Sequence, residues 1–70
     1  MPVNNSIRNI RKERCIKQLQ MAEDLQVTRQ TLTAIESCKY NPSLELALKI
    51  AKYFNLTVEE IFILEEEEIK

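Results

Sequence analysis

The chain has 70 residues, of which 44% are hydrophobic and 30% are charged, with a formal net charge of −1. A chain of this length closes one modest hydrophobic core, so residues 1–70 are expected to form a single domain. Its opening residues lack the apolar run of a secretory signal, and no stretch approaches bilayer-spanning length, so we expect a cytoplasmic protein with no membrane partner.

The two cysteines, Cys15 and Cys38, predict neither a disulfide framework nor a metal site. Two cysteines are too few for a disulfide scaffold, and the chain has no histidine to complete a zinc site. We therefore expect free, partly buried thiols, with no metal and no cofactor.

Charge is distributed unevenly along the chain. Residues 1–42 carry seven lysine or arginine residues against four acidic ones, whereas residues 43–70 carry three against seven. A dipolar domain of this kind can present a basic face to phosphate groups while its acidic end points away. The net charge therefore does not exclude a nucleic-acid partner.

Apolar residues recur three and four positions apart rather than alternating, which predicts helices throughout. The first expected helix begins at Ser6, a favourable N-cap residue, and runs to Arg14. Ile7 and Ile10 would form its buried face, and basic residues would occupy the rest.

Two short helices separated by a tight turn are expected next. The first runs from about Gln18 to Leu25 and would bury Ala22, Leu25 and either Leu19 or Met21. After the turn, Thr28 is the N-cap of a helix over residues 29–37, with Leu32 and Ile35 facing inward. The 3.6-residue period leaves the following positions outward: Arg29, Gln30, Thr33 and Ala34.

The remaining chain predicts a longer helix and a short one. The residue before Pro42 is pushed out of the helical region, so Ser43 can cap a fourth helix that ends at Asn55. Its expected apolar stripe comprises Leu44, Ala47, Leu48, Ile50, Ala51 and Phe54. Thr57 and Glu60 have the spacing of a capping box that opens a fifth helix, followed by an apolar run over residues 62–64 and an acidic tail over residues 65–70.

The stretch from Gln18 to Glu36 resembles the helix-turn-helix of the lambda-repressor and Cro-like (XRE) family. Asn41-Pro42-Ser43-Leu44 and Leu48-Lys49-Ile50-Ala51 match its later signature, so the resemblance covers about residues 7–64. It implies an all-α, five-helix DNA-binding domain whose helix-turn-helix occupies about residues 18–37. Very short family members further imply an antiparallel pairing between residues around Val3 and residues 64–67.

The resemblance also implies roles for individual residues. In the major groove of DNA, bases would be read by Arg29, Gln30, Thr33 and Ala34. The sugar-phosphate backbone would be gripped by Lys17, Gln18, Thr28, Thr31, Lys39, Tyr40 and Asn41. Gln18 would also brace Gln30, and Arg11 and Glu36 would form a structural ion pair. For any one of these polar residues, the alternative is ordinary solvated surface.

The sequence departs from the family at three helix ends where glycine is usual. Cys15, Gln26 and Cys38 stand there, and each costs about 1 kcal/mol if the left-handed geometry is kept. Lys17 also stands where a serine or threonine would cap the second helix. Neither departure falls on the expected reading face.

These residues predict a sequence-specific regulator of transcription that binds double-stranded DNA, acting as a repressor and as a homodimer on a palindromic operator. The expected dimer interface comprises Val58, Phe62, Ile63 and Leu64, although Phe62 and Leu64 can instead complete the core. An antitoxin or accessory subunit that docks a protein partner is the alternative function. No enzyme activity and no small-molecule ligand are expected, because the chain has neither a histidine nor a glycine-rich loop.

Overall fold

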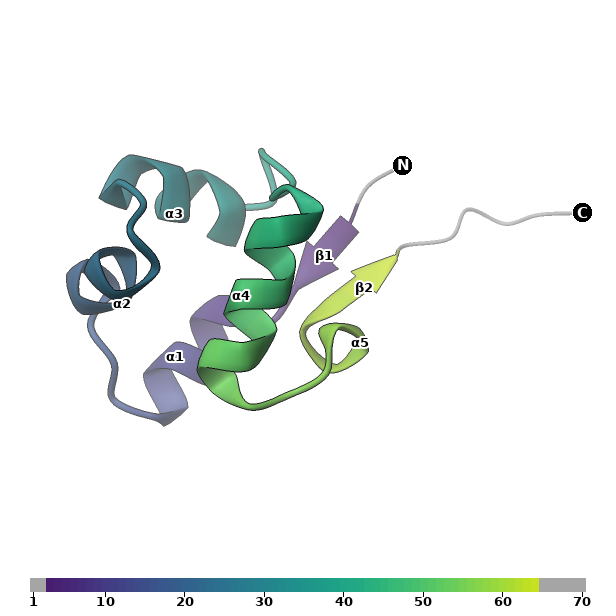
Figure 1. Cartoon of the computed structure of the whole chain (residues 1–70), viewed down its shortest axis with the longest axis horizontal. Coiled ribbons are helices and arrows are strands. Elements are labelled where there is room, and N and C mark those ends of the chain that lie inside the picture. Colours follow the sequence, from purple (N-terminus) through teal and green to yellow (C-terminus); the bar gives the residue numbers. More distant parts are fainter. Residues whose placement is uncertain (1–2, 65–70) are drawn as a thin grey trace, which may run out of the picture.

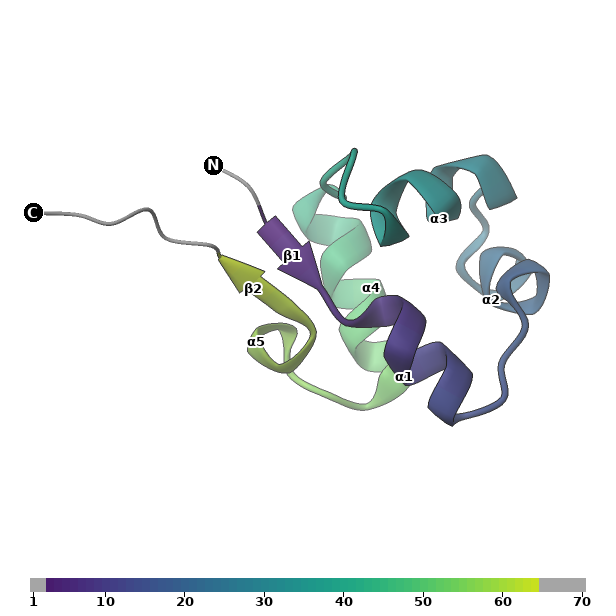
Figure 2. The ribbon, with the colours of Figure 1, turned by 180° about the vertical axis from the view of Figure 1, so that it is seen from behind.

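The computed structural model describes residues 3–64 as five helices and a two-stranded ribbon (Figure 1). In chain order the elements are β1 (Val3–Asn5), α1 (Ile7–Glu13), α2 (Gln18–Leu25), α3 (Arg29–Glu36), α4 (Leu44–Phe54), α5 (Val58–Ile61) and β2 (Phe62–Leu64). The all-helical class and the pairing of the two ends are both confirmed. The ribbon lies at one end of the molecule, and α2 and α3 lie at the other (Figures 1 and 2).

Local hydrogen bonds explain where most helices begin. The side chains of Thr28, Ser43 and Thr57 each accept a hydrogen bond from the backbone N–H three residues later, and Thr57 forms the expected capping box with Glu60. Ser6 holds the N-cap position of α1, but its side chain makes no capping bond. Three of the four predicted side-chain caps are thus formed.

The side chain of Asn5, rather than that of Ser6, caps the N-terminus of α1. Its Oδ1 accepts a hydrogen bond from the N–H of Ile7 at 3.2 Å, and its Nδ2 donates to the carbonyl of Ile35 at 2.8 Å. One side chain of the ribbon therefore closes the N-terminus of α1 and the C-terminal turn of the neighbouring α3. No local sequence pattern indicates this role, because Asn5 contacts a residue 30 positions further along the chain.

The three positions where glycine is usual keep the left-handed geometry. The φ angles of Cys15, Gln26 and Cys38 are 58°, 62° and 64°, and Asn55 at the end of α4 has a φ angle of 60°. Asparagine tolerates this region, whereas the other residues each lose about 1 kcal/mol relative to glycine. Both cysteines are free and exposed, so the expectation of partly buried thiols was wrong. Both cysteines lie in turns that connect helices, and such connections run over the protein surface.

Among residues 3–64, the core consists of ten buried hydrophobic side chains: Ile7, Met21, Ala22, Leu25, Leu32, Ile35, Ile50, Ala51, Phe54 and Ile61. Of the two alternatives for α2, Met21 is completely buried and Leu19 is 53% exposed. Ile61, at the end of α5, was not among the expected core residues. In the described part of the chain, the seven large side chains that are fully buried come from α1 through α5, so every helix contributes to one core.

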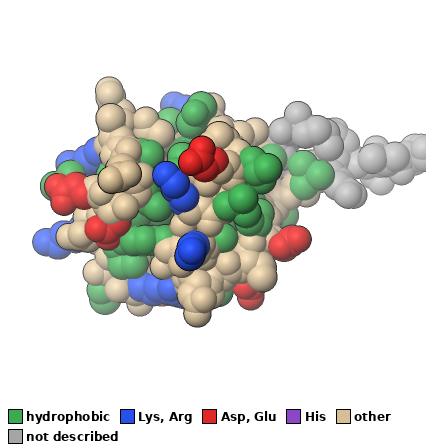
Figure 3. All heavy atoms as spheres, viewed as in Figure 1, with side chains coloured by type: hydrophobic (Ala, Val, Ile, Leu, Met, Phe, Trp, Pro, Cys, Tyr) green, Lys and Arg blue, Asp and Glu red, His purple; other side chains and the backbone are tan. Residues whose placement is uncertain are grey.

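The expected apolar stripe of α4 was partly wrong. Leu44 and Leu48 are 75% and 53% exposed, whereas Leu46 packs against the core. The helix is apolar over most of its circumference, so its own period allows more than one face; the row of Leu46, Ile50 and Phe54 at four-residue spacing is the one that meets the other helices. Hydrophobic side chains accordingly gather over α4 and toward β2 on the face in Figure 3.

The ribbon joins the two ends of the described chain. Val3, Asn4 and Asn5 lie opposite Leu64, Ile63 and Phe62 in an antiparallel pair. The N–H of Ser6 donates to the carbonyl of Ile61, which continues the ladder into the start of α1. The expected pairing extended to residues 65–67, which lie outside the described residues. Within residues 3–64, no helix combines the length and apolar character needed to cross a membrane.

Candidate nucleic-acid interface

The outer face of α3 carries polar side chains that do not pack in the hydrophobic core. Leu32 and Ile35 are completely buried, which fixes the rotation of the helix about its axis. Arg29, Gln30 and Thr33 are therefore exposed on the opposite arc, and Ala34 is half-buried at its edge. α3 runs along the outside of the molecule with this arc uncovered (Figure 1).

A shallow groove brings these side chains together with two residues from the end of the helix. It is lined by Arg29, Gln30, Thr33, Ala34, Ser37 and Lys39. All four residues expected to read bases thus lie in one hollow, which we call the reading groove. Ser37 was not expected there; it lies four residues after Thr33, so helical spacing alone places it on the same face.

Most of the expected backbone-contacting residues stand before or after the reading groove in sequence, whereas Lys39 also lines it. Lys17 and Gln18 stand at the start of α2, and Lys39, Tyr40 and Asn41 are exposed in the turn after α3. The Thr28 hydroxyl is engaged within the protein, because its oxygen accepts from the N–H of Thr31 and its proton is donated to the Thr31 hydroxyl at 2.9 Å. Thr31 itself is half-buried.

Arg11 and Glu36 form an ion pair between α1 and α3. The Arg11 Nε and Nη2 atoms donate to the two carboxylate oxygens at 2.8 and 3.2 Å, and Nη1 donates to the carbonyl of Ile16 at 3.1 Å. The two side chains are only 11% and 6% exposed. Removing one partner of such a pair leaves the other charge buried and costs about 3–5 kcal/mol.

Gln18 connects this ion pair to the reading groove. Its Nε2 donates to Glu36 Oε1 at 3.2 Å, and its Oε1 accepts a hydrogen bond from Arg29 Nε at 3.1 Å. The expectation that Gln18 braces Gln30 was therefore wrong, since its partner is the residue before. Both residues are outward on the first turn of α3, and only the packing of α2 against α3 decides which one Gln18 meets.

A second hollow adjoins the reading groove and contains basic residues of α1. It is lined by Arg8, Arg11, Lys12, Gln18, Thr33, Glu36 and Ser37, so it shares Thr33 and Ser37 with the reading groove. Arg8 and Lys12 are exposed and four residues apart on one face of α1. The sequence shows this spacing, but it does not show that this face lies beside α3.

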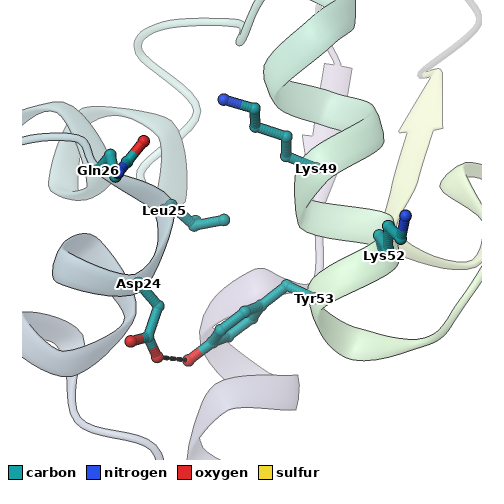
Figure 4. A pocket seen from close by; sticks show the side chains of 6 residues that line it. All are labelled: Asp24, Leu25, Gln26, Lys49, Lys52 and Tyr53. Carbon is teal, nitrogen blue, oxygen red and sulfur yellow. Dashed lines mark hydrogen bonds between the residues drawn. The ribbon is translucent and has the colours of Figure 1, made fainter.

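A third hollow lies between the C-terminal end of α2 and α4 (Figure 4). Its lining comprises Asp24, Leu25, Gln26, Lys49, Lys52 and Tyr53, none of which belongs to the reading groove. The Tyr53 hydroxyl donates to Asp24 Oδ2 at 2.6 Å, which ties α4 to α2. Burial, this hydrogen bond and the Asp24 charge, in that order, raise the pKa of Tyr53 to about 12. Tyr53 is therefore neutral at physiological pH, and its hydrogen bond to Asp24 is a structural link between α4 and α2.

The chain is similar to several known proteins. The chain matches the helix-turn-helix family over residues 7–61. It is 46% identical, over 66 residues, to an uncharacterised helix-turn-helix-type transcriptional regulator of Methanocaldococcus jannaschii, covering 94% of this chain and 100% of the relative. The chain belongs to the helix-turn-helix family. Its members bind double-stranded DNA and regulate transcription.

Two further similarities bear on function and fold. The immunity repressor protein of Bacillus phage phi105 is 39% identical over 96% of this chain, which spans 50% of that protein. A crystal structure of a candidate DNA-binding protein from Bacteroides fragilis superimposes with a TM-score of 0.77, covering 86% of this chain and 97% of the other at 23% identity. The latter supports the helical fold alone.

Proposed function

We propose that this helix-turn-helix protein is a sequence-specific repressor that reads bases with Arg29, Gln30, Thr33 and Ala34. The observation that carries the proposal is the reading groove, in which these four side chains lie on the uncovered arc of α3. Arginine can bond a guanine edge through two donors, glutamine can bond adenine in the same bidentate manner, and the Ala34 methyl can contact that of thymine. Each bidentate contact contributes about 1–3 kcal/mol of discrimination.

Contacts to phosphate would hold α3 in register without reading sequence. The start of α2, the first turn of α3 and the turns beside α3 supply these contacts, from Lys17, Gln18, Thr28, Thr31, Lys39, Tyr40 and Asn41. Arg8 and Lys12 join this set because their hollow shares residues with the reading groove. Because Thr28 and Thr31 bond each other, their contribution is smaller than that of the exposed cations.

The proposed repressor acts as a homodimer on a palindromic operator. Among the four expected interface residues, Val58 and Phe62 pack partly against the core, while Ile63 and Leu64 are each 53% exposed. The exposed pair therefore supplies most of the apolar surface that a second copy can cover. A symmetric dimer joined there would present two recognition helices about 34 Å apart, one turn of DNA.

Repression would follow from occupancy, since a bound dimer excludes polymerase from the same DNA. The phage relative, named an immunity repressor, supports this direction of regulation. The proposal requires no cofactor, small-molecule ligand or enzymatic step, and it places the protein in the cytoplasm with the DNA.

Selection of bound duplexes from a random pool tests this function. We expect enrichment of a palindromic consensus whose half-sites are one helical turn apart. Recovery of unrelated sequences after several rounds would contradict sequence-specific binding, and recovery of a single half-site would contradict the dimer. The variant Gln30→Ala should alter the consensus at one position of each half-site, while Lys52→Ala, outside the reading groove, should leave it unchanged.

The dimer is tested separately by sedimentation of Ile63→Asp. A charge at this position would be buried in the proposed interface, so we expect a folded monomer. Circular dichroism verifies folding, and Leu19→Asp serves as a matched control because Leu19 is equally exposed, at 53%, but lies on α2. A folded Ile63→Asp protein that stays dimeric would place the interface elsewhere.

A protein-docking role is the second candidate function. Leu44 and Leu48, four residues apart on α4 and 75% and 53% exposed, favour it because such a pair offers an apolar anchor to another chain. An antitoxin or accessory subunit would use such a surface, and DNA binding would then be secondary. A stoichiometric partner that co-purifies with the parent protein and is lost from Leu44→Lys/Leu48→Lys would favour this function.

A further inference from the structure

Four polar side chains form a continuous chain of hydrogen bonds from α1 to the reading groove. Arg11 donates to Glu36, Gln18 donates to the same carboxylate at 3.2 Å, and Arg29 donates to Gln18 at 3.1 Å. Arg11 and Glu36 are nearly inaccessible to solvent, whereas Arg29 is exposed in the reading groove. A buried charge thus connects directly to a side chain that lines the reading groove.

The chemistry of the two neighbours of Gln18 allows only one orientation of its amide. The Glu36 carboxylate can only accept hydrogen bonds, and the Arg29 guanidinium can only donate them. The NH2 group of Gln18 must therefore face Glu36, and its oxygen must face Arg29. A flipped amide would present its NH2 group to the guanidinium and its oxygen to the carboxylate, losing both bonds.

The Gln18 oxygen in turn selects how Arg29 is presented. It accepts from Nε, so both terminal nitrogens of the guanidinium stay available. Those two nitrogens form a planar fork that matches the paired acceptors on the major-groove edge of guanine. A fork held at Nε has fewer rotamers to lose when it binds.

We propose that Glu36 is a positioning residue for base reading, acting through the amide of Gln18 to aim Arg29. This inference rests on the proposed function, because it requires Arg29 to be a base-reading residue. Glu36 then does more than stabilise the fold: its negative charge sets the amide orientation on which the preference for one base pair depends. Arg11 belongs to the same assembly, since it holds the carboxylate in place with two hydrogen bonds.

Three variants separate this role from simple stability. In Glu36→Gln the neighbour of Gln18 can donate as well as accept, so the amide is free to flip. Gln18→Ala removes the link and leaves the ion pair intact. The double variant Gln18→Glu/Glu36→Gln exchanges the two groups, so that a carboxylate accepts from Arg29 and from the new amide, while Arg11 still finds an oxygen acceptor.

The experiment measures binding of each variant to the selected operator and to an operator changed only at the base pair that Arg29→Ala identifies. We expect Glu36→Gln and Gln18→Ala to lose at least about fivefold in preference for that pair, and the double variant to recover most of it. Ile50→Val, which weakens the core without touching these four residues, should keep the full preference.

A measurement without DNA keeps the test decisive if Glu36→Gln folds poorly. The Arg29 Nε–H signal in nitrogen-15 NMR should be protected from exchange with water in the parent protein and unprotected in Gln18→Ala. Retained preference in a folded Glu36→Gln or in Gln18→Ala, or no recovery in the double variant, would overturn the inference. If instead Arg29→Ala itself changes no base preference, the proposed reading role of Arg29 fails, which is a different result.

Discussion

Two interhelical links on different sides of α2 contrast in burial and in surroundings. The link from Arg11 to Glu36 joins α1 to α3, is nearly inaccessible to solvent and leads into the reading groove. The link from Tyr53 to Asp24 joins α4 to α2, lies at an open hollow and contacts nothing that faces the groove (Figure 4). Burial makes the first link costly to break, and its connection to Arg29 gives it the proposed consequence for DNA binding, which the second link lacks.

The largest expected effect comes from breaking the buried link. Arg11→Met should lower the free energy of unfolding by about 3–5 kcal/mol, because Glu36 would remain buried without its cation. Urea denaturation followed by circular dichroism measures the change. Arg8→Met is the matched control, since Arg8 lies on the same helix but is exposed. A loss below that of the control would mean that water reaches Glu36 in the folded protein.

The next largest effect distinguishes the reading groove from the hollow between α2 and α4 by their expected contributions to DNA binding. Gln30→Ala should weaken binding to the selected operator by about 1–3 kcal/mol and relax preference at one base pair. Lys39→Ala should weaken all duplexes alike, because phosphate contacts carry no sequence information. Lys49→Ala, in the hollow between α2 and α4, should do neither. Binding curves on operator and scrambled duplexes separate these outcomes, and a preference that changes in Lys39→Ala but not in Gln30→Ala would contradict the proposed placement of α3 on DNA.

A smaller effect is expected at the exposed link. Tyr53→Phe should lower stability by about 1 kcal/mol through the lost hydrogen bond to Asp24. The pKa of Tyr53 is about 12 in the folded protein against 10.0 ordinarily, so the unfolded chain holds fewer protons between these values. Stability contributed by Tyr53 is therefore complete below pH 10 and is lost as pH rises through the folded pKa.

Urea midpoints on either side of pH 10 test this dependence. Because other groups also titrate there, the informative quantity is the difference between the parent protein and Tyr53→Phe. That difference should shrink above pH 10. An unchanged difference would show that the pKa of Tyr53 is not raised by its surroundings.

The smallest effect concerns the basic face of α1. Arg8→Ala should make the dependence of affinity on salt less steep by about one counterion per half-site, with no change in base preference. Lys52→Ala is the matched control, because it removes one exposed cation on the other side of α2. Equal salt dependence in Arg8→Ala and the parent protein would remove α1 from the DNA-binding surface.

The parts of the fold that the sequence alone determined depend on interactions between residues close together in the chain. Thr28, Ser43 and Thr57 begin their helices because a hydroxyl reaches an N–H three residues away, and such a contact depends on nothing farther along the chain. The left-handed turns at residues 15, 26 and 38 were expected from the resemblance to the family, which usually has glycine there. The outward face of α3 could also be predicted from the sequence, because the helical period places Leu32 and Ile35 together on the inward face.

Contacts between distant segments were decided only by the tertiary structure. The period of α4 allowed Leu44 and Leu48 to be buried, but the other helices cover Leu46 instead, because burial depends on where a neighbour lies. Gln18 meets Arg29 rather than Gln30 because of how α2 packs on α3. The basic face of α1 gains its proposed role only because α1 lies beside α3. Sequence patterns describe one helix at a time, whereas each of these outcomes is a property of two.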